Sequence, residues 1–307
     1  MAATSENRIG EFLRARRELV RPEDVGIPDL GRRRVPGLRR EELAMLAGVS
    51  ADYYVRLEQG RDQHPSAQVI DALARALRLD EDATIHLHEL AAPAPRRRRR
   101  SPSRSERVRP GVARLLEAWS HTPALIIGRR MDILAVNPLV TVLNPVCRVG
   151  ANMVRATFLD PSVREIYADY DKNAADTVAS LRASVGPDLD DPALIELVGE
   201  LSLKSELFRK LWARHEVRDK ADGDKRFIHP LVGPLDLRYE TFAVNGADGQ
   251  LLLVYHAEPG SPSARALALL SSMVAEGSDA VSPRDGSPPP RPSDRAPEPG
   301  RSGPTSA

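Results

Sequence analysis

The 307-residue chain has a single cysteine, Cys147, and few aromatic side chains. One cysteine excludes an internal disulfide, and no group of cysteines and histidines has the spacing of a zinc site. With only 5 Phe, 6 Tyr and 2 Trp, the hydrophobic cores must consist mainly of leucine, alanine and valine. The sequence therefore excludes a fold held together by disulfides or by structural zinc.

Long apolar runs and enzyme motifs are also missing. No apolar stretch approaches the roughly 18 residues that cross a membrane, and the N-terminus lacks the apolar core of a signal peptide. There is no G-x-S-x-G, no P-loop, no G-x-G-x-x-G after a strand and no H-E-x-x-H. We therefore expect a cytoplasmic protein without membrane contacts, catalytic residues, metal or cofactor.

Lysine is absent from the first third of the chain, where charge is carried by arginine. Residues 1–107 contain 21 arginines and 17 acidic residues, whereas residues 108–307 contain 23 basic and 26 acidic residues. A basic front part and a slightly acidic remainder indicate a nucleic-acid-binding end and a separate regulatory end.

The stretch RREELAMLAGVSADYYVRLEQGR, residues 39–61, predicts two short helices joined by a tight turn. Gly48 is the expected left-handed residue between them, and Ser50 can cap the second helix. A small residue at the helix crossing, a glycine in the turn and an apolar residue after it are typical of a helix-turn-helix. In that motif the second helix enters the major groove of DNA.

Residues 35–77, with the dense block GVS-x-x-Y-Y-x-R-L-E-Q-G-R, closely resemble the Xre-type helix-turn-helix regulators of actinobacteria. The subgroup that they resemble carries a C-terminal MmyB-like, PAS-like ligand-binding domain, and the resemblance covers about residues 7–275. Its C-terminal motifs include GRRMDILAVNP, LVGELSLKSELFRKLWARHEV and KRFIHPLVGPLDLRYETFAV. In one departure, Val136 stands where the family usually has tryptophan, which could reshape the pocket.

We therefore predict an α+β multidomain chain. An all-α domain of five helices should occupy residues 1–92, followed by an Arg/Pro/Ser linker at 93–107, a PAS-like domain at 108–276 and a disordered tail at 277–307. The PAS-like resemblance implies an antiparallel sheet of about five strands with helices over one face. In that domain we expect strands at 124–128, 131–137, 225–229, 235–244 and 251–257, and helices at 110–120, 139–147, 164–185, 193–201, 206–215 and 263–275.

The expected partner of the first domain is a double-stranded DNA operator. Ala51 and Val55 can meet thymine methyl groups, and Arg56 could contact guanine or phosphate or form a surface ion pair. The predicted DNA-binding residues are Arg39, Arg40, Ser50, Ala51, Asp52, Tyr53, Val55, Arg56, Arg61 and Gln63. Because one such domain recognises only a few base pairs, we expect a homodimer on two half-sites, with the C-terminal domain as its dimer surface.

The same resemblance implies a structural role for Glu58, paired with Arg14 or Arg17 of the first helix. The run Arg96–Arg100 is either a solvated spacer or a source of phosphate contacts. A flexible linker of this kind argues against rigid coupling between the two domains.

A pocket in a PAS-like fold lies between the inner face of the sheet and the helices. We expect it to take a small apolar, amphipathic or fatty-acyl-like ligand. The candidate ligand-binding residues are Asn137, Phe208, Trp212, Arg214, His215, Phe227, His229 and Tyr239, each of which could instead belong to an ordinary core. The alternative function is a DNA-binding regulator whose C-terminal domain is a protein-interaction or dimerisation module without a ligand.

Overall fold

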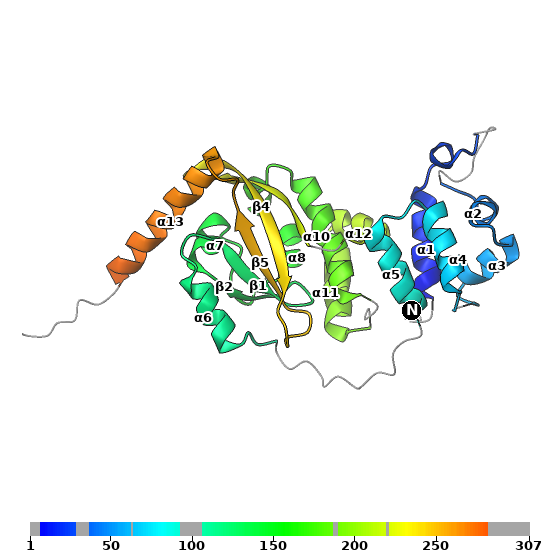
Figure 1. Cartoon of the computed structure of the whole chain (residues 1–307), viewed down its shortest axis with the longest axis horizontal. Coiled ribbons are helices and arrows are strands. Elements are labelled where there is room, and N and C mark those ends of the chain that lie inside the picture. Colours follow the sequence, from blue (N-terminus) through cyan, green and yellow to red (C-terminus); the bar gives the residue numbers. More distant parts are fainter. Residues whose placement is uncertain are drawn as a thin grey trace, which may run out of the picture.

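The computed structural model describes residues 7–28, 37–62, 64–92, 106–186, 190–218 and 221–281. Its first elements are helices, which form a bundle at one end of the molecule (Figure 1). They are α1 (Arg8–Leu19), the short 3-10 helix η1 (Pro22–Val25), α2 (Arg40–Ala47), α3 (Ala51–Glu58), α4 (Ala67–Ala76) and α5 (Glu81–Ala91). The predicted all-α domain of five helices is confirmed.

Apolar side chains at helical spacing build the core of this bundle. Phe12 and Leu13 of α1, Tyr54 and Leu57 of α3 and Leu73 of α4 are all fully buried in it. Because these positions recur on one face of each helix, packing the helices together removes one apolar stripe per helix from water.

The turn between α2 and α3 has the predicted chemistry. Gly48 has a φ of 68°, in the left-handed region, and the N–H of Val49 donates to the carbonyl of Ala44 at 3.0 Å. Ser50 then accepts a hydrogen bond from the N–H of Tyr53 at 3.1 Å, which caps α3. These local bonds hold the start of α3 at a fixed angle to α2.

A buried ion pair fixes α3 against α1. Nε of Arg17 donates to Oε2 of Glu58 at 2.9 Å, and NH1 of Arg17 donates to the carbonyl of Leu38 at 2.7 Å. Arg40 adds a bond to Oε1 of Glu58 at 2.8 Å. Burial opposes ionisation of Glu58, but the two arginines outweigh it and lower the pKa of the carboxyl. Of the two arginines predicted as partners, Arg17 makes the contact, whereas Arg14 pairs with Glu18 at the surface.

The second part of the chain surrounds a five-stranded antiparallel sheet of order β2-β1-β5-β4-β3. The strands are β1 (Ala124–Ile127), β2 (Ile133–Val136), β3 (Asp222–His229), β4 (Gly233–Ala243) and β5 (Leu251–His256). The helices are α6 (Pro110–Ala118), α7 (Pro138–Leu143), α8 (Met153–Leu159), α9 (Val163–Ile166), α10 (Tyr170–Val185), α11 (Pro192–Lys204), α12 (Glu206–Ala213) and α13 (Pro262–Val281). The predicted α+β architecture and sheet are confirmed.

Alternation along the strands separates the two faces of the sheet. In β3, Lys225, Phe227 and His229 are buried on the inner face, whereas Asp224 and Arg226 are exposed on the other. Side chains of the inner face share one core with residues of α7, α8, α10, α11 and α12. The expectation that helices cover only one face is wrong, because Leu116 of α6 packs on Ala124 and Ile126 at the opposite face.

Three details differ from the sequence-based expectation. Helix α8 was not predicted, and Asn152 caps it by accepting bonds from the N–H groups of Val154 and Arg155, both at 3.0 Å. The single helix expected at 164–185 is interrupted where Tyr167 forms an isolated bridge with Phe227 of β3. Helix α13 runs to Val281, past the predicted start of the tail, and residues 282–307 lie outside the described residues.

We expect Arg17→Ala to lower the free energy of unfolding by about 3 kcal/mol, because it leaves the buried Glu58 carboxylate with fewer partners. Arg14→Ala is the matched control, since its exposed pair with Glu18 should contribute less than about 0.5 kcal/mol. Urea unfolding of the full chain, followed by helical circular dichroism, measures both. Equal losses in the two variants would contradict this role for the buried pair.

Candidate functional site

The N-terminal half of α3 presents a row of exposed side chains. Ser50, Ala51, Asp52 and Arg56 are exposed, whereas Tyr54 is buried in the core. Figure 1 places α2 and α3 at the end of the molecule remote from the sheet. The predicted outward positions of the second helix therefore lie together on a surface that the C-terminal domain leaves open.

Tyr53 and Val55 are half-buried at the border of this surface. The guanidinium carbon of Arg56 lies 5.9 Å from the centroid of the Tyr53 ring, a weak cation–π distance that leaves the guanidinium edge exposed. Burial and the nearby Asp62 raise the pKa of Tyr53, against the opposing effect of Arg56. The hydroxyl therefore stays protonated, able to donate to a phosphate oxygen.

The predicted DNA contacts outside α3 and its cap are Arg39, Arg40, Arg61 and Gln63. Arg39 is exposed, and its N–H donates to Glu42 at 2.7 Å, which caps α2. Arg40 is 46% exposed although it also bonds Glu58, so it can serve both the fold and a phosphate. Arg61 is exposed directly after α3, and Gln63 lies outside the described residues.

Asn137, a predicted ligand contact, is fully engaged within the fold. Its side-chain oxygen accepts from the N–H groups of Ala124 at 3.1 Å and Val140 at 3.0 Å. Its nitrogen donates to the carbonyls of Trp119 at 2.8 Å and Thr122 at 2.6 Å. All four hydrogen-bonding positions are occupied, so this side chain joins β1, β2 and the start of α7.

The aromatic candidates on the sheet are packed against further aromatic rings. Phe227 and Tyr239 lie on the inner face, with ring centroids 5.5 and 6.3 Å from that of Tyr255. Tyr167 approaches Phe227 from the helix layer at 5.1 Å. These rings form a continuous apolar wall between β3, β4, β5 and the segment before α10.

The other predicted ligand contacts are distributed elsewhere. On α12, Phe208 is fully buried and stacks on Trp212 with centroids 5.8 Å apart. His229 uses both ring nitrogens, with Nε2 3.0 Å from the carbonyl of Val142 and Nδ1 3.2 Å from the N–H of Leu231. Arg214 is exposed beside Glu216, and His215 faces the N-terminal domain. The structure therefore does not bring the eight candidates into one site.

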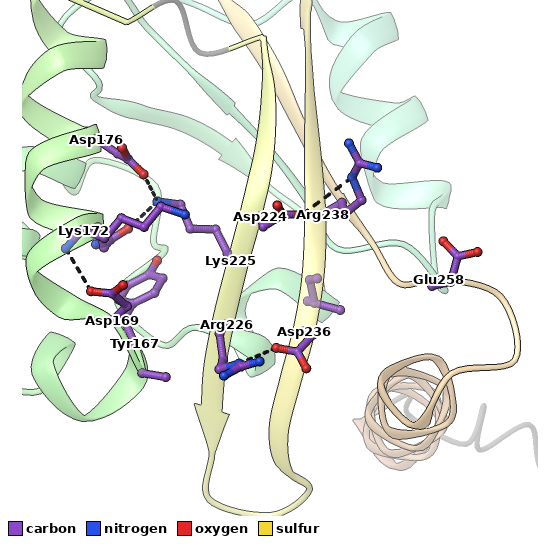
Figure 2. A pocket seen from close by; sticks show the side chains of 13 residues that line it. Tyr167, Asp169, Lys172, Asp176, Asp224, Lys225, Arg226, Asp236, Arg238 and Glu258 are labelled. Atoms are coloured by element: carbon purple, nitrogen blue, oxygen red, sulfur yellow. Dashed lines mark hydrogen bonds and ion pairs between the residues drawn. The ribbon is translucent and has the colours of Figure 1, made fainter.

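A groove of about 500 Å³ lies where α10 meets the edge of the sheet (Figure 2). It is lined by Lys225 of β3 and Leu237 of β4, by Asp169, Lys172 and Asp176 at the start of α10, and by ion-paired residues of β3 and β4. Tyr167 also lines it, so the polar groove reaches the aromatic side chains of the inner face.

Lys225 is a buried cation of the groove. Its side chain is 9% exposed, and Nζ donates to Oδ1 of Asn173 at 2.8 Å and lies 3.6 Å from Oδ2 of Asp176. Asp176 also bonds Arg218. Burial lowers the pKa of Lys225, although Asp176 opposes this effect. Lys172 lies on the same wall of the groove beside Asp169, so this end of the groove holds the carboxylates of Asp169 and Asp176 together with the cations of Lys172 and Lys225.

Lys225 is not among the site residues predicted from the sequence. It begins the strand predicted at 225–229, and the two-residue period already places it on the same face as Phe227 and His229. A lysine on the buried face of a strand is rare unless it is paired. A lysine at a buried position of this strand was the sequence signal for a functional or structural polar group at this edge of the sheet.

Comparison with protein families places both parts of the chain. A family model described as MmyB-like transcription regulator ligand binding domain matches residues 108–270, more than half of the chain. The chain belongs to the MmyB-like transcription regulators. A second model, described as a helix-turn-helix domain, matches residues 8–87 of this regulator. No curated protein matched the chain when the sequences were compared.

The described part of the regulator contains no helix with the length and apolarity that a membrane crossing requires. Within the same residues, no group of three or more His, Cys, Asp or Glu side chains is arranged to hold a metal ion. The described residues form an exposed face on α3, a charged groove and a contact between the domains.

The two domains of the MmyB-like regulator touch directly. Val217, just after α12, is buried in the core of the N-terminal domain, and Ala183 of α10 packs against that core. Phe12 of α1 lies edge-on to His86 of α5 at 5.5 Å and to His215 at 6.4 Å. We call this contact the interdomain seam. It joins the domains independently of the linker, which the sequence-based expectation of loose coupling did not foresee.

Arg182 of α10 is the central charge of the interdomain seam and is 2% exposed. Its guanidinium lies 3.9 Å from the Trp212 ring, NH2 donates to the Trp212 carbonyl at 2.7 Å, and NH1 is 3.4 Å from Nδ1 of His215. Among the described residues, Nε has no hydrogen-bond partner. Burial lowers the pKa of Arg182 to about 10, which Glu11 opposes.

The same burial acts on both histidines of the seam. Burial and then the charge of Arg182 lower the pKa of His86 to about 4. Burial, Arg182, His86 and Arg16 lower that of His215 to about 3. Both rings are therefore neutral in the closed contact at neutral pH.

We expect Arg56→Ala to weaken operator binding by about 1–3 kcal/mol, because a guanidinium contact to a base or phosphate is lost. Fluorescence anisotropy on duplexes selected from a random pool measures the change, with the exposed Arg75→Ala as control. A loss confined to selected sequences indicates a base contact, and a uniform loss indicates a phosphate contact. Unchanged affinity would remove Arg56 from the DNA surface.

We expect acidification to open the interdomain seam before the chain unfolds. Both histidines have lowered pKa values in the closed contact, so its stability is complete above about pH 6.5 and decreases as the pH falls toward 4. Each should weaken the contact by about 1.4 kcal/mol per pH unit in that range. In a Trp119→Phe background, the emission of Trp212 should shift to the red between pH 7.5 and 5 while helical circular dichroism is retained.

His86→Phe combined with His215→Asn should abolish this shift, and asparagine suits the left-handed φ of 51° at position 215. His88→Asn is the matched control on α5, because His88 pairs with Asp71 at 2.8 Å outside the seam. An emission shift that persists in the double variant would assign the pH response to other groups.

Proposed function

We propose that this DNA-binding transcription regulator binds a small amphipathic molecule with an acidic head group at the groove beside Lys225. Occupancy of the groove then changes the affinity of the helix-turn-helix domain for its operator. The main support for this proposal is that helix α10 and the short segment after α12 connect the groove to the interdomain seam.

The connecting helix is α10. Asp176 of the groove and Arg182 of the seam stand six residues apart on it, a separation of about 9 Å along the axis. The connecting segment follows α12. His215 and Val217 contact the N-terminal domain, while the next residue, Arg218, bonds Asp176 at the groove. A shift of Asp176 or Arg218 is therefore transmitted to residues that hold the two domains together.

The chemistry of the groove supports an acidic head group. Asp176 pairs with both Lys225 and Arg218, so an incoming carboxylate could replace Asp176 on either cation. The volume of about 500 Å³ falls within the usual range for small-molecule sites. Tyr167, which lines the groove, leads to the apolar wall formed by Phe227 and Tyr239, which suits an apolar tail.

Replacement of Asp176 gives the ligand a physical means of regulation. A ligand shifts an equilibrium only if it binds two states with different affinity. In the closed state Asp176 holds Arg218, and with it the segment that inserts Val217 into the N-terminal core. A ligand whose acidic group binds Arg218 in place of Asp176 favours the state in which this segment is released from the N-terminal core. The difference in ligand affinity between the two states couples the groove to the DNA surface.

The second candidate function is a C-terminal domain that serves as an interaction module without a ligand. The observation in its favour is the dense packing of the inner face, where Phe208 and Phe227 are at most 1% exposed. A tail that enters this wall must displace packed side chains. The two candidates differ in one measurable property, the binding of an amphipathic acid.

We expect n-alkanoic acids of graded length to bind the regulator, and the alkanols of equal length to bind at least about tenfold more weakly. Lys225→Met should reduce the affinity for the acids to that for the alcohols, because the buried cation is removed while most of the side-chain volume is kept. Isothermal titration measures both series, and operator affinity is then compared with and without the tightest acid.

Lys210→Met is the matched control, since Lys210 is 68% exposed on α12, pairs with Glu206 and is not among the residues that line the groove. It should leave acid binding unchanged. Equal affinity for acids and alcohols would remove the head-group role of Lys225. No binding of either series, with operator binding intact, would favour the interaction module.

A further inference from the structure

Helix α13 is packed on one face only. Leu267, Leu270 and Ser271 are buried against the domain, and Oγ of Ser271 bonds Nδ1 of His121 at 2.7 Å and the carbonyl of Ser120 at 2.9 Å. On the opposite face, Leu269 is 61% exposed and Met273 is 47% exposed. A helix that is apolar on two faces and buried on one has a second face that a partner can cover.

The exposed face has the spacing of a helix-pairing surface. Arg265, Leu269, Ser272 and Glu276 are all exposed and follow one another at intervals of four, three and four residues. This is the period of the stripe through which two helices pack side by side. Ala268 and Met273 flank the stripe on its two sides.

We propose that a second copy of this chain packs antiparallel on this face of α13, with a twofold axis crossing the helix between residues 270 and 271. That axis places Arg265 opposite Glu276 of the second copy, Ala268 opposite Met273, and Leu269 opposite Ser272. Each large side chain then meets a small one, and each charge meets its opposite. A parallel pair would instead place each charge against its own kind.

The shape of the chain leaves room for this partner. Helix α13 has 20 residues, about 30 Å, and Figure 1 shows its distal part extending beyond the sheet and the other helices. An isolated helical segment of this kind is only marginally stable in water. Pairing with a second copy gives the projecting turns a packing partner.

The inference builds on the proposed function, because a regulator that recognises two half-sites needs a twofold contact between its copies. A contact through one helix pair is small, but both DNA domains bound to one duplex would hold the copies near each other and strengthen it. The dimer is isologous, so one surface of the chain serves both partners.

Sedimentation equilibrium of the full chain without DNA tests the dimer. Arg265→Glu and Glu276→Arg should each raise the dimer dissociation constant about tenfold, because each creates two like-charge contacts in the symmetric pair. The double variant R265E/E276R should return to within about threefold of the unchanged chain. Arg265 also bonds the Gly260 carbonyl, and the double variant does not restore that bond, so recovery can come only from the pair across the axis.

Leu269→Asp should raise the dissociation constant further, with Leu203→Asp as control, because Leu203 is 88% exposed on α11. A chain that stays monomeric at all concentrations, or a double variant no better than the single ones, would overturn the proposal. Anisotropy on a single half-site measures DNA binding separately. A regulator that binds the half-site but does not dimerise would refute this interface and leave the proposed function standing.

Discussion

The contact between the two domains depends on Val217, which is buried in the core of the N-terminal domain. It lets the end of α12 complete a core that belongs to another domain, so that DNA-binding and ligand-binding parts share buried surface. Around it, Phe12 and the two seam histidines form a partly polar boundary with Arg182. Protonation of either histidine would place a charge in this buried boundary and weaken the contact.

Arg182 explains why this boundary is well defined and yet can open. A buried guanidinium without a carboxylate partner loses solvation that one carbonyl bond and the Trp212 ring only partly replace. Such a group adds little net stability, but it accepts only one arrangement of its neighbours. The cost of its burial lowers the stability of the closed contact, which the proposed population shift requires. In the DNA domain, by contrast, Arg17 is fully paired with Glu58, so α3 is held in one position.

Local sequence chemistry predicted most of the fold. Gly48, Ser50 and Asp80 mark helix ends through their own backbone or side-chain bonds, which depend only on neighbouring residues. Helix α8 was missed although Asn152 caps it through local bonds to Val154 and Arg155; the amide of Asn152 also bonds Asp132, twenty residues earlier in the chain. The choice of Arg17 over Arg14 and the groove around Lys225 depend on residues 41 to 52 positions apart in the chain. Such partners are brought together only by tertiary packing, which periodicity does not encode.

Composition indicates which end of the chain binds DNA, whereas the folded structure defines which side chains are exposed there. Arginine-rich sequence predicted a DNA end, but the surface that can contact DNA is defined by the few side chains that α3 exposes while Tyr54 and Leu57 hold it to the core. Aromatic residues predicted a pocket wall, yet their rings are mutually packed, and the accessible space lies at the charged edge of the sheet. A ligand domain with a filled centre can still respond at its rim, because α10 runs from that rim to the seam. In the proposed function, the position of the charges relative to α10 matters more than the size of any cavity, because α10 connects the groove to the seam.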